Sequence, residues 1–324
     1  MPALFLAPCH MSTAPTTPIP SKRKGTQTAA FGIALAMLGA VAFSGKAIIV
    51  KLAYRYGVDA VTLIMLRMVF ALPFFVGMSW WASRPVAGRK VVALTRRDWI
   101  GIAGLGVSGY YLASFLDFAG LAYITASLER LILYLNPTLV LLLGWALVGR
   151  RIAPRQALGM AISYAGVLLV FGHEVKLDGS DVALGALLVF LSAVSYAVYL
   201  FYSGEMVQRL GSMRLVGLAT SVACLLCIVQ FIVLRPMQGL WNVAPEVIWL
   251  SVLNATLCTV VPVMLVMMAI ERIGSGLAAQ VGMVGPMSTM LMGVLLLNEP
   301  LTVWLVGGTA LVIAGVAVCS RTSS

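Results

Sequence analysis

Long apolar runs separated by short polar segments make up almost the whole chain. A helix needs about 20 apolar residues to cross the hydrocarbon core of a membrane. Barrel strands would instead alternate apolar and polar positions, which these runs do not. We therefore expect an all-α membrane protein with ten transmembrane helices, at residues 28–50, 60–82, 99–123, 126–148, 156–172, 182–203, 213–234, 247–270, 275–297 and 301–319.

The two halves of the sequence are copies of each other. A shift of 149 positions places Pro137 on Pro286 and Gly166 on Gly315 without a gap. Internal self-similarity of this kind indicates a duplicated architecture. The copies, residues 28–173 and 182–319, each hold five expected helices. Because five is odd, the second copy enters the membrane in the opposite orientation, which predicts two inverted five-helix repeats, an arrangement typical of secondary transporters.

Composition and charge are typical of an integral membrane protein. The chain is 61% hydrophobic and 10% charged, far from the composition of soluble domains. Its net charge of +11 comes from Lys and Arg in loops, so we do not expect nucleic acid as a partner. If the N-terminus is cytoplasmic, fifteen Lys and Arg lie on that side and five on the other. Both termini should then be cytoplasmic, with residues 1–25 forming a disordered tail.

Cysteine and histidine usage gives no sign of a metal or another cofactor. Four of the five cysteines lie in apolar spans and form no disulfide framework. Cys224 and Cys227 share a helix face, but both histidines lie outside the spans, so a metal site would lack ligands. Nothing resembles the phosphate-binding motif G-x-x-x-x-G-K-[ST], so ATP could drive the protein only through another subunit.

Five ionisable residues lie inside the expected helices: Lys46, Arg67, Asp117, Glu129 and Arg130. A charge at mid-bilayer costs roughly 2.5 to 3.5 kcal/mol on insertion scales, so retained charges usually face a partner or water. Three cations and two anions leave one cation over. Our hypothesis is that Lys46 or Arg67 binds a substrate carboxylate. The alternative is that Arg67 pairs with Asp117 or Glu129 and fixes the helices.

Asp117 and Glu129 are the two acids placed deeply enough for proton coupling. A buried carboxyl group holds a proton more readily than an exposed one, so either residue could exchange protons during transport. The alternative is structural, because ion-pair networks place acids in the same way. Glu129 would then pair with the adjacent Arg130, and Asp117 with Lys46.

Proline interrupts the fourth and ninth spans at equivalent positions. Asn136 precedes Pro137 in the first copy, and Gly285 precedes Pro286 in the second. Broken helices at membrane depth occur where they line a cavity. We therefore predict helix breaks at both prolines and treat Asn136 as a solute-binding candidate.

The sixth span and the start of the ninth add three further binding candidates. Tyr196 and Tyr199 lie at helical spacing in an aromatic stripe, and their hydroxyl groups suit a solute cavity. The alternative is that this stripe serves packing. Gln280 takes the place that Leu131 has in the first copy, and it brings a polar side chain into the ninth span.

The membrane spans also carry recognisable motifs: Gly285-Pro286 before the turn LNEPLT, the preceding segment AIERIGSGLAA, and LR-x3-A in the second span. In these motifs the chain resembles the EamA family of the drug/metabolite transporter superfamily, over about residues 28–319. The resemblance implies the ten-helix fold and export of amino acids or other small metabolites, mostly across bacterial inner membranes. The chain departs from the family at Gly149-Arg150-Arg151, where an acid is common, and at Lys46, where the family usually has a small or polar residue.

Together these features predict a secondary transporter that moves a small polar metabolite, an amino acid or related organic anion, by alternating access. The resemblance implies outward transport in a bacterial inner membrane, by a monomer or homodimer in contact with lipid. Two alternatives stay open: a lipophilic-cation or drug exporter of the same fold, and a non-transporting sensor or scaffold. An enzyme would show clustered His, acids or a Ser nucleophile, and the sequence shows no such cluster.

Overall fold

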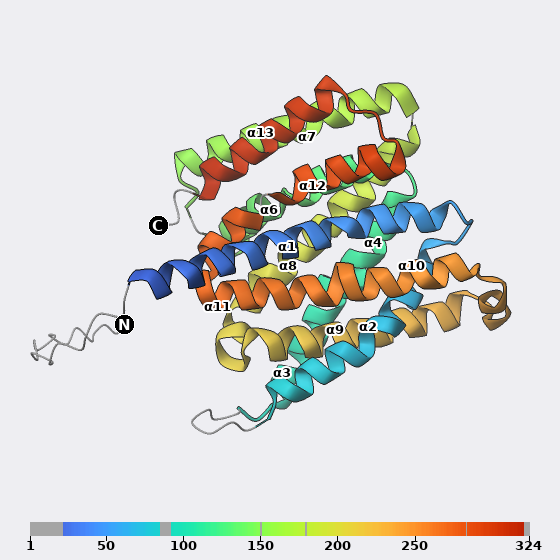
Figure 1. Ribbon diagram of the computed structural model, residues 1–324, viewed down its shortest axis with the longest axis horizontal. Coiled ribbons are helices and arrows are strands. Elements are labelled where there is room, and N and C mark those ends of the chain that lie inside the picture. The colour runs from blue at the N-terminus through green and yellow to red at the C-terminus, as the bar shows by residue number, and fades with distance from the viewer. Residues whose placement is uncertain (1–21, 85–91, 150, 179, 283, 321–324) are drawn as a thin grey trace, which may run out of the picture.

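The computed structural model describes residues 22–84, 92–149, 151–178, 180–282 and 284–320, and every regular element in these ranges is a helix (Figure 1). The α-helices are α1 (Lys22–Tyr54), α2 (Ala60–Ala82), α3 (Arg96–Gly106), α4 (Ala113–Leu121), α5 (Ala126–Leu133), α6 (Asn136–Val148), α7 (Pro154–Asp178), α8 (Ser180–Leu210), α9 (Ser212–Leu234), α10 (Pro245–Ala255), α11 (Val261–Gly282), α12 (Val284–Met292) and α13 (Val303–Ser320). The π-helical segments η1 (Val107–Leu112), η3 (Thr256–Val260) and η4 (Gly293–Leu297) and the 3-10 helix η2 (Met237–Asn242) connect some of them.

Eight helical segments in the described ranges are long and apolar enough to cross a membrane. They are Ala30–Tyr54, Ala60–Ala82, Arg96–Leu121, Ala126–Val148, Pro154–Val175, Asp181–Gly204, Ser212–Leu234 and Pro245–Val266. Two further apolar helices, Val284–Leu297 and Val303–Val318, are shorter. The first eight predicted spans are thus confirmed by length and composition, whereas the last two are confirmed only as apolar helices.

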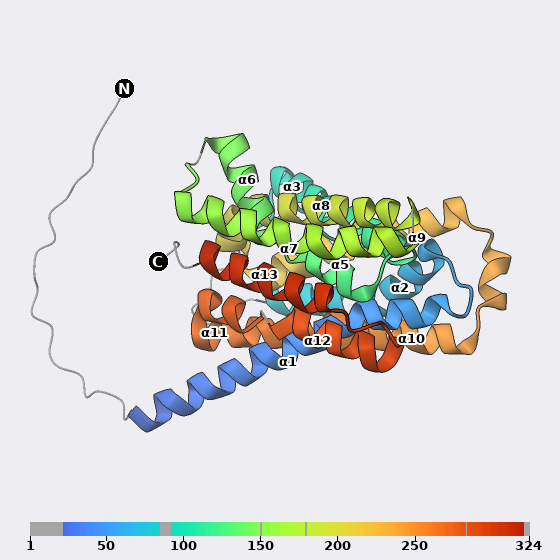
Figure 2. The ribbon, with the colours of Figure 1, turned by 90° about the horizontal axis from the view of Figure 1, so that it is seen from above.

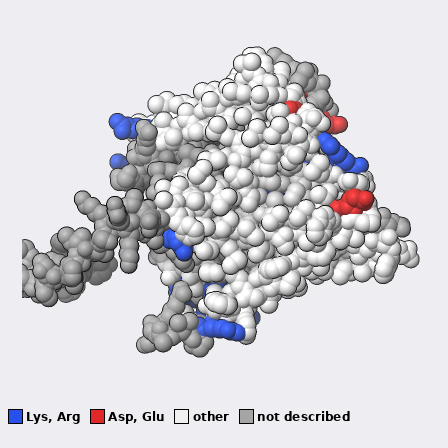
Figure 3. Space-filling view, viewed as in Figure 1, with Lys and Arg blue, Asp and Glu red and all other residues white. Residues whose placement is uncertain are grey.

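The surface of the bundle suits a bilayer. The face in Figure 3 is almost entirely uncharged, and its Lys, Arg, Asp and Glu side chains gather at the two ends. Large apolar side chains on the outside include Leu168, Leu187, Leu225, Val233 and Leu295. Continuous exposed apolar area marks a surface that contacts membrane or protein. The fold is therefore that of a multi-pass helical membrane protein.

Polar residues between the apolar runs start the helices. Asp59 precedes α2, and its carboxylate accepts from the backbone N–H of Val61 and Thr62. Thr95 and Asp98 form a capping box at the start of α3. Side-chain acceptors of this kind satisfy backbone donors that have no partner within a helix. The polar segments therefore fix where the membrane helices begin.

Three pairs of helices lie side by side along much of their length: α1 with α11, α2 with α9, and α7 with α13 (Figures 1 and 2). The largest packing cluster joins α1, α2, α4 and α9, with Ile48, Leu63 and Phe118 fully buried in it. Its α1 residues all lie in the last third of that helix, between Ala47 and Ala53, so a polar residue beside them is removed from solvent.

Glycine allows α7 and α13 to approach closely at two points. A Cβ atom on Gly166 would lie 2.7 Å from the carbonyl oxygen of Gly308. One on Gly315 would lie 2.5 Å from the carbonyl oxygen of Gly159. Backbones can come this close only where small residues face each other. The separation of these helices therefore depends on both contacts.

The segment between the eighth and ninth predicted spans differs from the prediction. A loop was expected after residue 270, but α11 continues to Gly282. Glu271 and Arg272 have good helix propensity, and Arg272 Nη1 donates to the carbonyl of Met268 one turn earlier. The predicted ninth span is consequently divided among the end of α11, α12 and η4.

Candidate functional site

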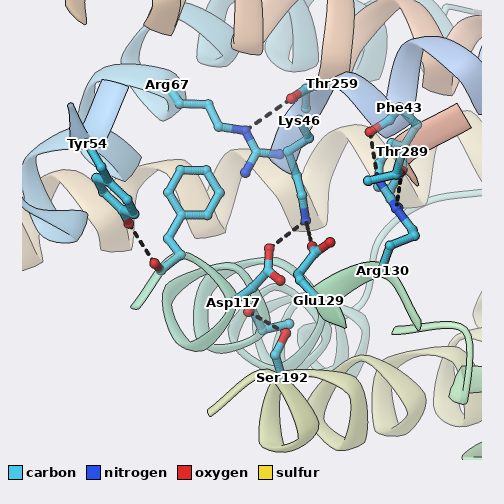
Figure 4. Close-up of polar contacts among 12 residues, drawn as sticks. Phe43, Lys46, Tyr54, Arg67, Asp117, Glu129, Arg130, Ser192, Thr259 and Thr289 are labelled. Carbon is cyan, nitrogen blue, oxygen red and sulfur yellow. Dashed lines mark hydrogen bonds and ion pairs between the residues drawn. The ribbon is translucent and has the colours of Figure 1, made fainter. Parts of the chain in front are cut away.

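Three buried ionisable side chains meet near the centre of the bundle (Figure 4). Lys46 Nζ on α1 lies 2.5 Å from Asp117 Oδ2 on α4 and 3.2 Å from Glu129 Oε1 on α5. The three residues are exposed by 6%, 2% and 0%. We call Lys46, Asp117 and Glu129 the acid–lysine cluster. With all three groups ionised its net charge is −1, so one ammonium serves two carboxylates.

Local structure brings the two acids together. Asp117 lies in the middle of α4, and a short turn leads to α5, whose N-cap is Thr125. Glu129 is in the first turn of α5, where a carboxylate is favoured by the unpaired N–H groups of the helix start. The structural alternative from the sequence pairs Asp117 with Lys46 and Glu129 with Arg130. The structure shows the first pair, whereas Glu129 faces Lys46 instead.

Arg67 on α2 is buried beside this cluster without a carboxylate partner in the described residues. Its Nε donates to Thr259 Oγ1 on η3 at 3.0 Å, and its guanidinium lies 5.2 Å from the ring centre of Phe118. Nη1 is buried and has no hydrogen-bond partner. The alternative in which Arg67 pairs with Asp117 or Glu129 is therefore not what the structure shows. The guanidinium retains donors for another acceptor.

Arg130 on α5 has a parallel arrangement. Its Nε donates to Thr289 Oγ1 on α12 at 3.0 Å, and its Nη2 donates to the carbonyl oxygen of Phe43 at 3.1 Å. The guanidinium lies 5.3 Å from the ring centre of Phe43. Both arginines are thus held by a threonine hydroxyl from the second half of the chain and by an aromatic ring. Figure 4 shows Arg67 and Arg130 on opposite sides of Lys46.

Several polar atoms in this region have no hydrogen-bond partner in the described residues. They are Arg67 Nη1, Asp117 Oδ1, Glu129 Oε2 and both side-chain amide atoms of Asn254. Each buried donor or acceptor left unpaired costs about 1 to 3 kcal/mol. A region with so many unpaired polar atoms is unfavourable if its role is only structural, and it suits the binding of a polar solute. No group of three or more His, Cys, Asp and Glu residues able to hold a metal occurs in the described part of the chain.

Asn136, Tyr196 and Tyr199 take no part in these contacts. Asn136 begins α6 with Pro137 in its first turn, and Asn136 Oδ1 has no partner. Tyr196 and Tyr199 stack on each other at 5.5 Å and belong to another packing cluster, in which the Tyr199 and Tyr110 hydroxyls lie 3.3 Å apart. These contacts resemble the packing alternative. The Gln280 side chain lies outside the described residues.

Sequence reasoning missed a contact at the far end of the bundle from the two termini. Glu299, in the turn before α13, accepts from Ala126 N at 2.7 Å, from Ser127 N at 3.3 Å and from Ser127 Oγ at 2.7 Å. Its carboxylate thus binds the start of α5, a position that favours anions. Within the same site, Thr125 Oγ1 donates to Glu174 Oε1 at 2.7 Å. The sequence feature that could have pointed to Glu299 as a contact residue is its position in the LNEPLT turn.

The bundle and the comparisons with known proteins agree. The EamA-like transporter family matches residues 30–172 and again residues 183–321. The chain belongs to this family. It is 30% identical over 302 residues to the uncharacterized transporter YcbK of Bacillus subtilis (strain 168), covering 89% of this chain and 93% of the relative. An uncharacterized transporter of Archaeoglobus fulgidus is 23% identical over 285 residues, covering 88% of this chain and 94% of the relative.

The fold of this EamA-like chain also occurs in a solved crystal structure. The match has a TM-score of 0.59 and 19% identity, and it covers 92% of this chain and 97% of the other. At that identity the match shows the fold alone. Family membership and the two relatives together make the protein a membrane transporter.

Proposed function

We propose that the chain is a secondary transporter that moves a small organic anion, such as an amino acid or related carboxylate, by alternating access. The observation that carries this proposal is the state of Arg67. The residue is 6% exposed, and its guanidinium has no acid opposite it among the described residues and has an unpaired Nη1. A carboxylate is the natural acceptor for such a group. The direction of transport is taken from the resemblance to the family, which implies export.

Lys46 takes a different role in this proposal from the one the sequence alone favours. Its ammonium faces two carboxylates within 3.2 Å, so a substrate anion at Lys46 would meet two like charges. We therefore assign first contact with the substrate carboxylate to Arg67. Lys46 contributes by holding Asp117 and Glu129 beside it.

Proton coupling fits the same cluster. Two carboxylates sharing one ammonium leave one negative charge uncompensated, and one bound proton would remove it. We infer that Asp117 or Glu129 binds this proton and couples its movement to that of the anion. Transport of a labelled substrate into proteoliposomes should then depend on the pH gradient. The dependence should disappear in Asp117→Asn or Glu129→Gln.

The duplicated sequence supports alternating access between two inverted repeats, residues 28–173 and 182–319. Under the 149-residue shift, Gly159 corresponds to Gly308 and Gly166 to Gly315. The contacts Gly166 with Gly308 and Gly159 with Gly315 therefore exchange with each other, as a two-fold relation between repeats requires.

A second correspondence has the same form. Gly149 and Asn298, also 149 residues apart, both end a helix in the left-handed conformation, with φ of 68° and 57°. Left-handed residues that end helices at equivalent positions support the repeat.

The excess of basic residues at the end of the bundle that holds the two termini supports a cytoplasmic placement of both termini. We place the protein in the cell membrane of a prokaryote with this orientation.

The test is thermal stabilisation of the purified protein by a panel of carboxylates, amino acids and lipophilic cations. A ligand at 100 times its Kd stabilises by about 2.7 kcal/mol. Stabilisation should occur with anionic or zwitterionic solutes and be lost in Arg67→Gln, because a hydrogen bond to a charged group contributes about 1.5 to 3 kcal/mol. Arg84→Gln, an exposed arginine at the end of α2, is the control. Stabilisation by lipophilic cations alone would instead favour the drug-exporter alternative.

A further inference from the structure

A groove on the outside of the bundle, between α3 and α8, has the chemistry of a phospholipid site. Its volume is about 730 Å³, within the range of small-molecule sites. Figure 2 shows α3 and α8 on the same side of the molecule. The groove is lined on α3 by Arg97, Asp98, Gly101, Gly104, Leu105 and Ser108 and on α8 by Val198, Tyr202, Met206 and Arg209. We call it the α3–α8 groove.

Charge is confined to one end of the α3–α8 groove. Arg97 and Arg209 are both exposed there, near the start of α3 and the end of α8. Asp98 is already occupied, because one carboxylate oxygen pairs with Arg209 and the other accepts from Thr95 N and Oγ1. Arg97 has no carboxylate partner among the described residues. This end of the groove is therefore net positive and open to an anion.

The remaining length of the groove is uncharged and matches one leaflet. Arg97 and Ser108 are eleven positions apart in the sequence, which at 1.5 Å per residue is a rise of about 16 Å. Half of the hydrocarbon core is about 15 Å thick. Trp99, beside Arg97, is 49% exposed, and exposed Trp is typical of the membrane–water interface. The charged end thus lies at headgroup depth and the apolar part at acyl-chain depth.

Glycine leaves space in the α3–α8 groove for an acyl chain. A Cβ atom on Gly104 would meet nothing within 4 Å, whereas one on Gly101 would lie 2.9 Å from Met206 Sδ. The floor of the groove is therefore open at Gly104 and closed by Met206 beside Gly101. Met side chains are flexible and adapt to irregular apolar partners.

We propose that the α3–α8 groove binds one anionic phospholipid of the leaflet nearest the start of α3. The phosphate-containing headgroup contacts Arg97 and Arg209, and one acyl chain lies along Gly104, Leu105 and Tyr202. This proposal needs only that the chain spans a membrane, so it does not depend on the solute or on coupling. Charge complementarity favours an anionic lipid over a zwitterionic one.

The experiment is native mass spectrometry of delipidated full-length protein titrated with phosphatidylglycerol or phosphatidylcholine of the same acyl chains. The wild type should bind one phosphatidylglycerol more tightly than phosphatidylcholine. Arg97→Gln should weaken phosphatidylglycerol binding about fivefold, the effect of one basic residue at an anionic surface. Arg84→Gln, which removes an exposed arginine near the same end outside the groove, should leave it unchanged.

Gly104→Leu tests the acyl-chain half and should weaken binding of both lipids, because the new side chain fills the open floor. Its control is Gly77→Leu on α2, an exposed position that also has nothing within 4 Å. Equal affinity for both lipids, equal effects of Arg97→Gln and Arg84→Gln, or equal effects of the two leucine variants would each overturn the proposal. Loss of a dimer in Gly104→Leu without any change in lipid binding would show that a second copy occupies the groove instead.

Discussion

Replacing Lys46 by Met should destabilise the protein strongly. The substitution removes the ammonium that lies 2.5 Å from Asp117 and 3.2 Å from Glu129. It changes the net charge of the acid–lysine cluster from −1 to −2 while both acids stay buried. Removing one partner of a buried ion pair costs about 3 to 5 kcal/mol, because it leaves a charge without compensation. The free energy of unfolding should fall by about that amount near pH 7.

The double variant Lys46→Met, Asp117→Asn separates charge from packing. It restores the cluster charge to −1, so it should recover at least about 1 kcal/mol of the loss despite carrying one more substitution. Unfolding by SDS in mixed micelles, followed by tryptophan fluorescence, measures both variants against the wild type. A loss below about 1 kcal/mol in the single variant, or a double variant no more stable than it, would refute the pairing of Lys46 with these acids.

Three further outcomes follow from other contacts. Glu299→Gln should cost about 1 to 2 kcal/mol in the same assay, because a neutral amide accepts less strongly from the Ser127 backbone and hydroxyl groups. Gly166→Leu should prevent correct folding, measured as the monodisperse yield on size exclusion, because its Cβ would lie 2.7 Å from the Gly308 carbonyl. Burial raises the pKa of Asp59, but hydrogen bonds from Thr62 and Arg235 and the nearby charge of Arg235 outweigh it, so the pKa lies below the ordinary 3.8. Its stabilising contribution should therefore be present above about pH 4 and lost as pH falls through the lowered pKa, measured as a shrinking stability difference from Asp59→Asn.

A specific experimental result would contradict each of these three predictions. Gly77→Leu should give the wild-type yield, so a similar loss in both glycine variants would mean that leucine itself, rather than the contact between α7 and α13, is the cause. For Glu299, unchanged stability in the glutamine variant would show that its charge does not contribute at the start of α5. A constant difference between wild type and Asp59→Asn from pH 7 to pH 3 would contradict the lowered pKa.

The apolar pattern was sufficient for most of the fold, because the length of an apolar run depends on local sequence alone. The first eight spans could be located in this way. The path of α11 could not, because the two glycines near residue 275 suggest a loop while the flanking residues favour helix. Which tendency prevails depends on packing against α1, which a local pattern does not contain.

The candidate site was predictable as a set of residues but not as a set of pairs. Burial of five charges in apolar spans follows from the sequence, since each stands out against its neighbours. Pairing depends on depth and rotation of separate helices. The sequence alone therefore does not indicate that Lys46 contacts both acids or that Arg67 contacts Thr259 on η3. Tyr199 shows the same limit, because its hydroxyl lies near Tyr110 in a packing cluster.

Among the described residues, the charges buried in and beside the acid–lysine cluster come from the first half of the chain, while the hydroxyl groups that hold Arg67 and Arg130 come from the second. In a transporter of the proposed kind, these charges would face one set of uncharged residues of the second half when the protein opens to one side, and another set when it opens to the other side. The two open states would then be unequal in electrostatic potential, so a substrate would meet one affinity on one side of the membrane and another on the opposite side.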